Sequence, residues 1–243
     1  MQVTIGEELM LLSLDDESGV AKEAASAGWA VAGGILADLV LAGRVTVDDG
    51  RLAVADRTPT GDPLLDGRLD RLAEWADRKA DEKAAGKAAG KAADRVAGQA
   101  KASDWLTRDR PTAVRDAVQR LCERGLVTEE RHRAFGLFPV RRYPEADPTV
   151  ERELRERLAA AVLRGEDPDA RTATLIALIH ATRLYRLAFP DLPRKEVEPR
   201  FAAIAAGEWA SGPVGEAIRN TQAAIAAITV VTAATAATTA VIT

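Results

Sequence analysis

The segment Trp29–Val45 constrains the fold more than any other part of the chain, because it is apolar on almost every face of a helix. Up to Ala42, only the glycine pair Gly33-Gly34 and the single acid Asp38 interrupt it. A helix that is hydrophobic all round lies inside a protein or inside a membrane. The apolar run Ala30–Ala42 is shorter than the ~20 residues that cross a bilayer. We therefore expect a buried central helix with other helices packed around it.

The glycine pair in this segment should have a structural reason. Each glycine costs a free helix about 1 kcal/mol relative to alanine. Close approach of a neighbouring helix backbone would offset that cost, and an anion-binding turn is the alternative. We predict the close approach at Gly33 and Gly34.

Composition extends this prediction to the whole chain. Hydrophobic residues make up 47% of the 243 residues but aromatic residues only 4%, so alanine, leucine and valine must fill the core. Small side chains favour closely packed helices. We predict a mainly α fold, with residues 1–243 forming one helical-bundle domain around the central helix. The net charge of −4 gives no general attraction to nucleic acid or acidic lipid, so either partner would need a local basic patch.

Several features bear on the cellular compartment. Cys122 is the only cysteine, which excludes an internal disulfide and fits a reducing cytosol. Met1–Glu8 lacks a basic region followed by an apolar run, so we expect no signal peptide. The uncharged tail 223–243 is long enough to span a bilayer, but alanine and threonine insert weakly. We expect this tail to form a buried helix beside the central one.

Two β-hairpins are predicted, each after a helix that ends in glycine. Valines and leucines alternate around Asp48-Asp49-Gly50, which is a strong signal for a hairpin at about 44–55. A second hairpin, at about 126–141, is predicted from strands at Leu126–Thr128 and Ala134–Phe138 with a turn at Glu129–Arg133. The chain thus repeats a helix followed by a hairpin.

The other predicted elements are helical. Asp62 should cap a helix that begins at Pro63. A low-complexity Lys/Ala/Gly segment at about 79–101 should be a solvated helix or a linker. The remaining helices are expected at Ile5–Leu14, Lys22–Ala42, Pro111–Glu123, Thr149–Arg164, Asp169–Leu187, Glu196–Trp209 and Val214–Thr243.

The sequence contains no constellation of catalytic residues. His132 and His180 lie far apart, and neither has a metal-ligand spacing to the other or to Cys122. There is no phosphate-binding P-loop and no nucleophile elbow. We therefore predict a protein that is not an enzyme and that has no metal and no cofactor.

Arginines gather around the second hairpin. Arginine binds phosphate oxygens in bidentate fashion, and interleaved acids make an ordinary solvated face the alternative. The hairpin is a candidate surface for membrane contact or self-association. Its candidate residues are Arg131, Arg133, Phe135, Leu137, Phe138, Arg141 and Arg142.

Together these features resemble the Golgi phosphoprotein 3 family (GPP34). The most specific sign of this resemblance is the pattern Pro-Thr-Gly-Asp-x-Leu-Leu-Asp. The resemblance covers nearly the whole chain except the lysine–alanine segment. It is carried by Ile5–Leu14, Gly33–Leu36, Gly43–Val45, Pro59–Asp66, Arg124–Val127, Leu137–Pro139 and Arg171–His180.

The resemblance implies an all-helical core with a projecting β-hairpin that serves in self-association. It also implies a peripheral membrane protein that binds phosphatidylinositol 4-phosphate. Eukaryotic members bind this headgroup through a tryptophan and an arginine near the central helix and through arginines of the helix before the hairpin. They act as adaptors that retain glycosyltransferases in the Golgi.

This chain departs from that headgroup pattern. Ala32 stands directly before the glycine pair, where the family pattern has arginine, and Glu23 stands at the ungapped tryptophan position. Trp29 lies close by in the sequence, and Arg110 and Arg115 lie next to the two matching positions of the later helix. We take Trp29, Arg110 and Arg115 as the candidate headgroup residues. We expect weakened or altered phosphoinositide specificity.

Three hypotheses follow. The first is a cytoplasmic adaptor, a bacterial-type member of the family, that binds anionic lipid on the inner face of a membrane and an unknown protein client. The second is a winged-helix-like nucleic-acid binder, which the negative net charge and the lack of a basic recognition helix disfavour. The third is a purely structural module, a homo-oligomer formed through the 126–141 hairpin.

Overall fold

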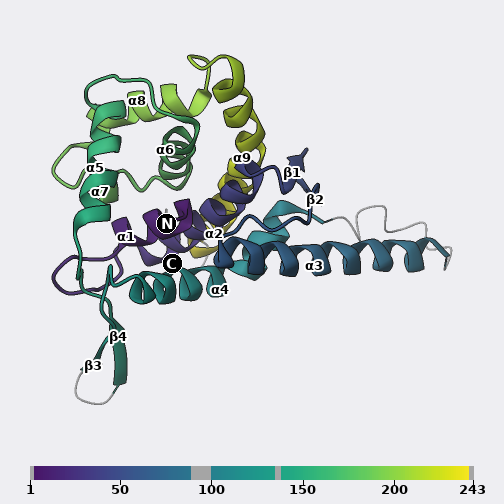
Figure 1. Ribbon diagram of the computed structural model, residues 1–243, viewed down its shortest axis with the longest axis horizontal. Coiled ribbons are helices and arrows are strands. Elements are labelled where there is room, and N and C mark those ends of the chain that lie inside the picture. Colours follow the sequence, from purple (N-terminus) through teal and green to yellow (C-terminus); the bar gives the residue numbers. More distant parts are fainter. Residues whose placement is uncertain (1–2, 89–99, 135–137, 241–243) are drawn as a thin grey trace.

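A helical body, from which one long helix and one β-hairpin project, makes up the molecule (Figure 1). The computed structural model describes residues 3–88, 100–134 and 138–240. Within these residues there are nine helices and two separate antiparallel hairpins, which confirms the predicted fold class. The assignment of the chain to one domain stays a prediction. The elements are α1 (Ile5–Ser13), α2 (Ala24–Leu41), β1 (Val45–Asp48), β2 (Arg51–Val54), α3 (Pro63–Ala88), α4 (Ala102–Glu123), β3 (Glu130–Ala134), β4 (Phe138–Arg142), α5 (Thr149–Val162), α6 (Ala170–Thr182), α7 (Tyr185–Ala188), α8 (Arg194–Ala206) and α9 (Gly212–Ala240).

Helix α2 is the predicted central helix. It contacts α1, α4, α6 and α9, and every residue from Ala27 to Val40 is buried. Among the described residues it is the one helix that is long and apolar enough to cross a membrane. Most of its length lies inside the protein instead, because the surrounding helices bury its apolar faces.

The glycine pair lies where two helices approach α2. A methyl group added to Gly34 would lie 2.8 Å from the backbone nitrogen of Gly6, so α1 crosses α2 at backbone contact. A methyl group added to Gly33 would lie 2.0 Å from Cδ1 of Ile228 in α9. Both glycines are in the interior of the helix and not in a turn. The predicted close approach of a helix backbone is confirmed at Gly34, whereas the space at Gly33 is filled by the side chains of Ile228 and Leu178.

The first hairpin has the predicted position. Strands β1 and β2 pair with Val45 opposite Val54 and Asp48 opposite Arg51. The two turn residues have positive φ, 46° at Asp49 and 70° at Gly50. This conformation matches the twist of a two-residue hairpin.

The second hairpin is shifted from its predicted register. The predicted turn Glu129–Arg133 lies largely in β3, and the predicted strand Leu126–Thr128 precedes the hairpin proper, where Val127 forms an isolated bridge with Glu145. The prediction was wrong because it required an apolar strand. The hairpin projects into solvent (Figure 1), so a strand as polar as β3 is stable there without burying one face.

Helices α4 and α6 also differ from the prediction at one boundary each. Helix α4 begins at Ala102 and not at Pro111, which lies inside the helix. The helix continues through the proline because the turns before it bury Trp105 and Leu106. Helix α6 ends at Thr182, where Arg183 adopts a left-handed conformation with a φ of 59°, so the residues up to Leu187 do not continue it.

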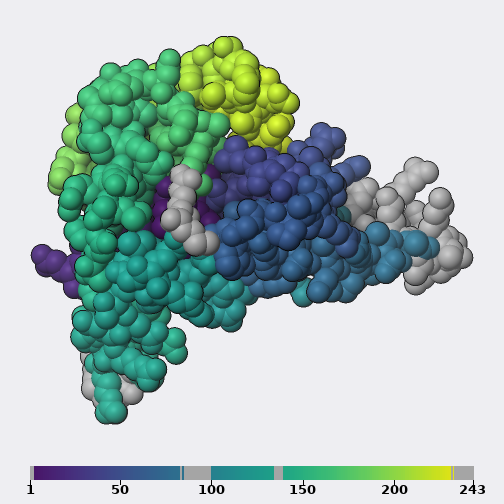
Figure 2. Space-filling view, in the orientation of Figure 1, coloured from purple at the N-terminus to yellow at the C-terminus, as the bar shows by residue number. Residues whose placement is uncertain are grey.

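Helix α3 is the long helix that projects from the body. Asp62 caps its start as predicted, because one carboxylate oxygen accepts from the backbone N–H groups of Leu64 and Leu65. The low-complexity segment 79–101 falls partly in this helix, which reaches Ala88, and residues 89–99 lie outside the described part. Figure 2 shows α3 and the second hairpin as two separate projections.

The tail forms helix α9, which packs on α2 and α6. Ala224 and Ile228 are fully buried in these contacts. The predicted buried helix beside the central one is confirmed for this part of the tail, and residues 241–243 lie outside the described part.

Helix α1 is held by buried acids that the sequence reading had not singled out. Glu7 is fully buried and accepts from Arg120 of α4 at 3.2 Å and from Arg124, directly after α4, at 3.1 Å. Glu8 points the other way and accepts from Arg157 of α5 at 2.6 Å. Two adjacent carboxylates thus connect α1 to opposite sides of the body.

The lone acid of α2 belongs to the same network. Asp38 accepts from the backbone N–H of Ile5 at 2.7 Å and from Arg171 of α6 at 2.8 Å. Burial raises the pKa of the Asp38 carboxyl to about 7, and Arg171 opposes that rise. Asp38 therefore ties the start of α1 to the central helix.

Candidate functional site

Trp29 and Arg110 come together between α2 and α4. The guanidinium carbon of Arg110 lies 4.4 Å from the centre of the Trp29 ring, which is cation–π geometry. Arg110 is part-buried and has no carboxylate within ion-pair distance among the described residues. The pair therefore presents a positive charge that no nearby side chain neutralises.

The indole of Trp29 also carries an unused hydrogen-bond donor. Trp29 is only 5% exposed, and its Nε1–H has no acceptor among the described residues. A buried N–H without a partner costs about 1–3 kcal/mol. A donor of this kind beside an unneutralised guanidinium is suited to an anionic oxygen.

Gly28 sets the space around the pair. A methyl group at Gly28 would lie 3.5 Å from Cγ and Cδ of Arg110 and 3.5 Å from Val114. The stem of Arg110 thus packs directly on the backbone of α2. A side chain longer than alanine at position 28 would displace the guanidinium from the Trp29 ring.

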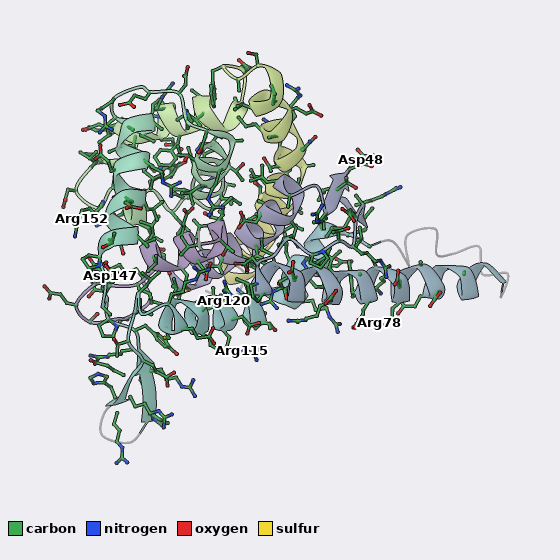
Figure 3. The ribbon with its side chains drawn as sticks, in the orientation of Figure 1. Asp48, Arg78, Arg115, Arg120, Asp147 and Arg152 are labelled. Carbon is green, nitrogen blue, oxygen red and sulfur yellow. The ribbon has the colours of Figure 1, made fainter. Side chains whose placement is uncertain are left out.

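Arg115 does not join this pair. Its side chain is 71% exposed and donates to Asp116 at 2.9 Å. In a helix with 100° per residue, positions 110 and 115 lie about 140° apart around the axis, and Val114 takes the place beside Arg110. Figure 3 shows Arg115 on the lower edge of α4, the side from which the hairpin projects.

The structure also describes positions 32 and 23, where the family pattern has its headgroup-binding arginine and tryptophan. Ala32 is 2% exposed within the core. Glu23 precedes α2 in a left-handed conformation with a φ of 50°. The structure therefore provides Trp29 and Arg110, but no arginine at position 32 and no tryptophan at position 23.

The second hairpin has one strongly basic face. Residues that pair across an antiparallel ribbon share a face, and Arg131 pairs with Arg141 while Arg133 pairs with Pro139. The side chains of Arg131 and Arg141 are 84% and 65% exposed. We call Arg131, Arg133 and Arg141 the hairpin basic face.

Two of the remaining hairpin candidates, Arg142 and Phe138, lie in β4. Arg142 pairs with Glu130 on the other face, and its Nε is buried without a partner among the described residues. Phe138 lies in β4, opposite Ala134. Phe135 and Leu137 lie outside the described residues.

The histidines and the cysteine do not form a site. Nδ1 of His180 lies 2.8 Å from the hydroxyl of Tyr185, and burial lowers the pKa of His180. His132 pairs with Glu130 on the exposed hairpin. Burial raises the pKa of Cys122. In the part of the chain that the structure describes, no group of three or more histidine, cysteine, aspartate or glutamate residues is arranged to hold a metal ion.

A comparison with known protein families shows which family the chain belongs to. Residues 5–221 match the family described as Golgi phosphoprotein 3 (GPP34). The chain belongs to the Golgi phosphoprotein 3 family. A search of curated proteins found no match.

The structure gives physical roles to the segments that carry the family resemblance. In Ile5–Leu14, Gly6 permits the crossing with α2, and the two following acids bind arginines from α4 and α5. In Pro59–Asp66, Asp62 caps α3 and binds Arg120 at 2.8 Å. These family segments stabilise the fold, and the candidate site lies outside them. A signal for the network was present in the sequence, since acids within apolar runs must be paired when they are buried.

Proposed function

We propose that this member of the Golgi phosphoprotein 3 family is a non-enzymatic peripheral protein that binds anionic lipid through Arg110 and Trp29. The observation that carries the proposal is the part-buried guanidinium over the Trp29 ring, next to an indole N–H without an acceptor. A lipid phosphate would accept hydrogen bonds from the guanidinium and, after a small shift of Arg110, from the indole. Family membership supports the same class of ligand.

The predicted affinity of this site is low. One cation near an anionic surface contributes about 1 kcal/mol, and the arginine of the family pattern is replaced by Ala32. The net charge of −4 opposes approach to an anionic membrane. Exposed Arg115, on the edge of α4 that faces the same side as the hairpin (Figure 3), adds a second weak contact. Binding should therefore depend on total negative charge more than on the 4-phosphate of the inositol ring.

The cellular role follows from this lipid contact. We place the protein in the cytoplasm, on the inner face of a membrane, as an adaptor for a protein client. The identity of the client does not enter the proposal. Lipid binding and client binding would use separate surfaces, because the Trp29–Arg110 site occupies only the junction of α2 and α4.

Co-sedimentation with vesicles tests the proposal. The vesicles would contain phosphatidylcholine alone, phosphatidylcholine with phosphatidylserine, or phosphatidylcholine with phosphatidylinositol 4-phosphate, at low salt. We expect binding to both anionic mixtures and none to phosphatidylcholine. Arg110→Ala should weaken binding about fivefold, which corresponds to about 1 kcal/mol. Trp29→Phe keeps the ring and removes the N–H, so it should weaken binding less than Arg110→Ala.

Arg78→Ala is the matched control. Arg78 is an exposed arginine on α3, where it pairs with Glu74 at 3.8 Å, away from the site. Arg78→Ala removes one positive charge, as Arg110→Ala does. Because Arg78 lies away from the site, this substitution should leave vesicle binding unchanged. Equal losses in Arg78→Ala and Arg110→Ala would refute a specific site. No binding of the wild-type chain to either anionic mixture would refute the lipid function itself.

A further inference from the structure

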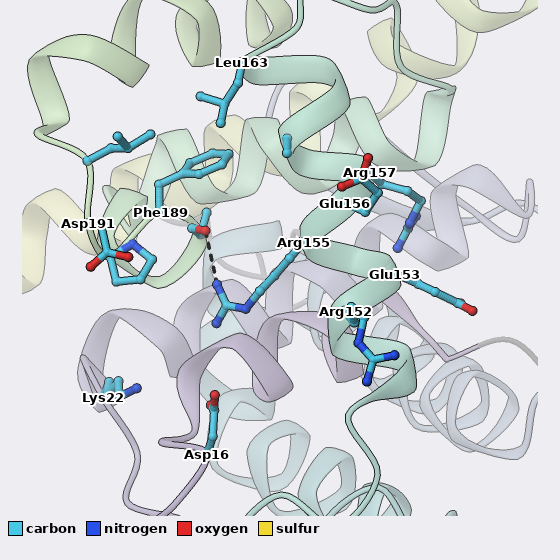
Figure 4. A pocket seen from close by; sticks show the side chains of 14 residues that line it. Asp16, Lys22, Arg152, Glu153, Arg155, Glu156, Arg157, Leu163, Phe189 and Asp191 are labelled. Carbon is cyan, nitrogen blue, oxygen red and sulfur yellow. Dashed lines mark hydrogen bonds between the residues drawn. The ribbon is translucent and has the colours of Figure 1, made fainter.

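A groove between α5, the segment 188–192 and the loop after α1 has no role in the proposed lipid site. Its volume is about 1070 Å³ (Figure 4). Phe189 and Leu192 form part of its apolar wall, and Leu163 at one end is 52% exposed. Sites for small ligands are concave and mostly apolar, with volumes of about 300–1000 Å³. The size and the lining of this groove therefore fit a small ligand.

The groove is apolar at one end and charged at the other. In Figure 4, Leu163 and Phe189 lie in its upper part and Asp16 lies in its lower part. Arg155 stands between the two parts, but it already donates to Glu151 and to two backbone carbonyl groups. A ligand that fills the groove would thus have an apolar chain and a charged head.

The charged residues of the groove leave an excess of negative charge. Four of them are paired within the chain: Lys22 with Asp15, Arg155 with Glu151, Arg157 with Glu8, and Glu156 with Arg164. The others are exposed and have no ion pair among the described residues, and they are the three acids Asp16, Glu153 and Asp191 and the single base Arg152. Three unpaired acids and one unpaired arginine give a net charge of −2. The head of the ligand should therefore be a cation.

Other acidic groups lie close to Asp16, at the charged end of the groove. Burial raises the pKa of Glu145 and of Glu151, and the Asp16 carboxylate raises both pKa values further. Arg155 opposes these rises. A cation bound beside Asp16 would reduce the repulsion among the three carboxyl groups further.

The walls of the groove indicate what form the ligand has. They consist of α5, the end of α7 with the turn after it, and the loop after α1, so the described lining contains no strand edge. An extended peptide that binds by strand addition needs such an edge for its main-chain hydrogen bonds. A flexible hydrocarbon chain needs only an apolar wall, and each methylene group that it buries increases the affinity about fourfold. These walls therefore favour a hydrocarbon chain over an extended peptide.

We propose that the groove binds one molecule of a single-chain amphiphile with an ammonium head. The hydrocarbon chain would lie along Phe189 and Leu163, and the ammonium group would lie at the Asp16 carboxylate. The carboxylates of Glu153 and Asp191 would favour the cation through their negative potential, without direct contact. An exposed ion pair contributes modestly, so the chain would supply most of the affinity and the acids would supply the preference for a cation.

Binding in the groove goes beyond the proposed lipid function and does not rest on it. The lipid site takes anionic headgroups of a membrane through Arg110, between α2 and α4. The groove would take single cationic amphiphiles from solution. Arg110→Ala should therefore leave binding in the groove unchanged, and either proposal can fail without the other.

Isothermal titration calorimetry of the full chain with three decyl detergents tests the proposal. Decyltrimethylammonium, decyl maltoside and decyl sulfate have the same chain with a cationic, a neutral and an anionic head. Each is used below its critical micelle concentration. We expect one bound decyltrimethylammonium per chain, with an affinity at least about tenfold above that for decyl sulfate. The affinity for decyl maltoside should lie in between.

Two variants separate the role of the head from that of the chain. Asp16→Asn with Asp191→Asn keeps the shape of the groove and removes two unpaired charges. It should weaken decyltrimethylammonium binding about fivefold and leave decyl maltoside binding unchanged. Leu163→Ser removes exposed apolar surface, so it should weaken the binding of all three detergents alike, by about fourfold. Circular dichroism establishes that each variant is folded.

Glu208→Gln with Glu216→Gln is the matched control. It removes two exposed acids outside the groove and changes the net charge by the same amount, so it should leave the binding of all three detergents unchanged. Equal losses in this control and in Asp16→Asn with Asp191→Asn would overturn the proposal, because net charge alone would then explain the preference. Equal affinities for the three heads would also overturn it. So would the absence of binding by any detergent, which would leave the groove to a basic segment of another protein.

Discussion

The contact between α1 and α2 gives the most direct test of the packing. Gly34→Ala places a methyl group 2.8 Å from the nitrogen and 3.0 Å from the Cα of Gly6. These are backbone atoms, so no side-chain rotation relieves the overlap and α1 must move. Overpacking of a core costs about 1–3 kcal/mol, and the upper end applies because backbone must shift. The gain in helix propensity returns about 1 kcal/mol. We expect a net loss of about 2 kcal/mol.

Gly67→Ala is the matched substitution. Gly67 lies in α3, and nothing lies within 4 Å of a methyl group added there. Only the gain in helix propensity then remains, and it should stabilise the chain by about 1 kcal/mol.

Thermal unfolding followed by circular dichroism measures both effects. For a chain of this size, 1 kcal/mol corresponds to about 2–4 °C. Gly34→Ala should therefore lower the Tm by about 4–8 °C, and Gly67→Ala should raise it by about 2–4 °C. A Gly34→Ala variant as stable as the wild type would refute the backbone contact between α1 and α2. A loss in Gly67→Ala would refute the assumption that propensity acts alone there.

Three other predictions concern buried charge and turn geometry. The folded chain holds the proton of Asp38 more tightly than an unfolded chain, since burial raises its pKa from 3.8 to about 7. The free energy of unfolding should therefore fall as the pH rises from about 4 to 7, by up to about 1.4 kcal/mol per pH unit. Urea titrations of Asp38→Asn should show a smaller fall over this range. An equal pH dependence in the variant and the wild type would contradict a raised pKa at Asp38. Glu7→Gln removes the fully buried counter-charge of Arg120 and Arg124, which keep their pairs with Asp62, and should cost about 3 kcal/mol by urea denaturation. A loss below about 1 kcal/mol would mean that Asp62 and water compensate both arginines. Gly50→Ala must hold a φ of 70° and should lower stability by about 1–2 kcal/mol, an effect that an unchanged Tm would disprove.

The sequence predicted those parts of the fold that local chemistry determines. Gly33-Gly34 predicted close helix packing because glycine in a helix interior needs a compensating contact. Asp49-Gly50 predicted a two-residue turn, and Asp62-Pro63 a helix start, because both depend on neighbouring residues alone. Each of these is a property of four or five consecutive residues.

Long-range packing decided the features that the sequence did not predict. Pro111 resembles a helix start, but Trp105, packed 5.6 Å from Trp75 of α3, extends α4 back to Ala102. The polar strand β3 lacks an apolar pattern because the projecting hairpin buries neither face. For the candidate site, the sequence supplied Trp29 and Arg110 as separate residues. Their stacking, and the separate orientation of Arg115, depend on the relative rotation of α2 and α4, which no local pattern determines.

The buried acids of α1 have a consequence for synthesis on the ribosome. Glu7 and Glu8 are among the first residues made, yet their arginine partners lie 113 to 149 residues later in the chain. At 5–20 residues per second, the partner of Glu8 is added roughly 7–30 s after Glu8 itself. During that interval α1 carries an acid whose burial would be unfavourable, so it should remain undocked. The earliest part of the chain to be made is thus among the last to reach its native position, and nascent chains that end before Arg157 should show fast hydrogen exchange in α1.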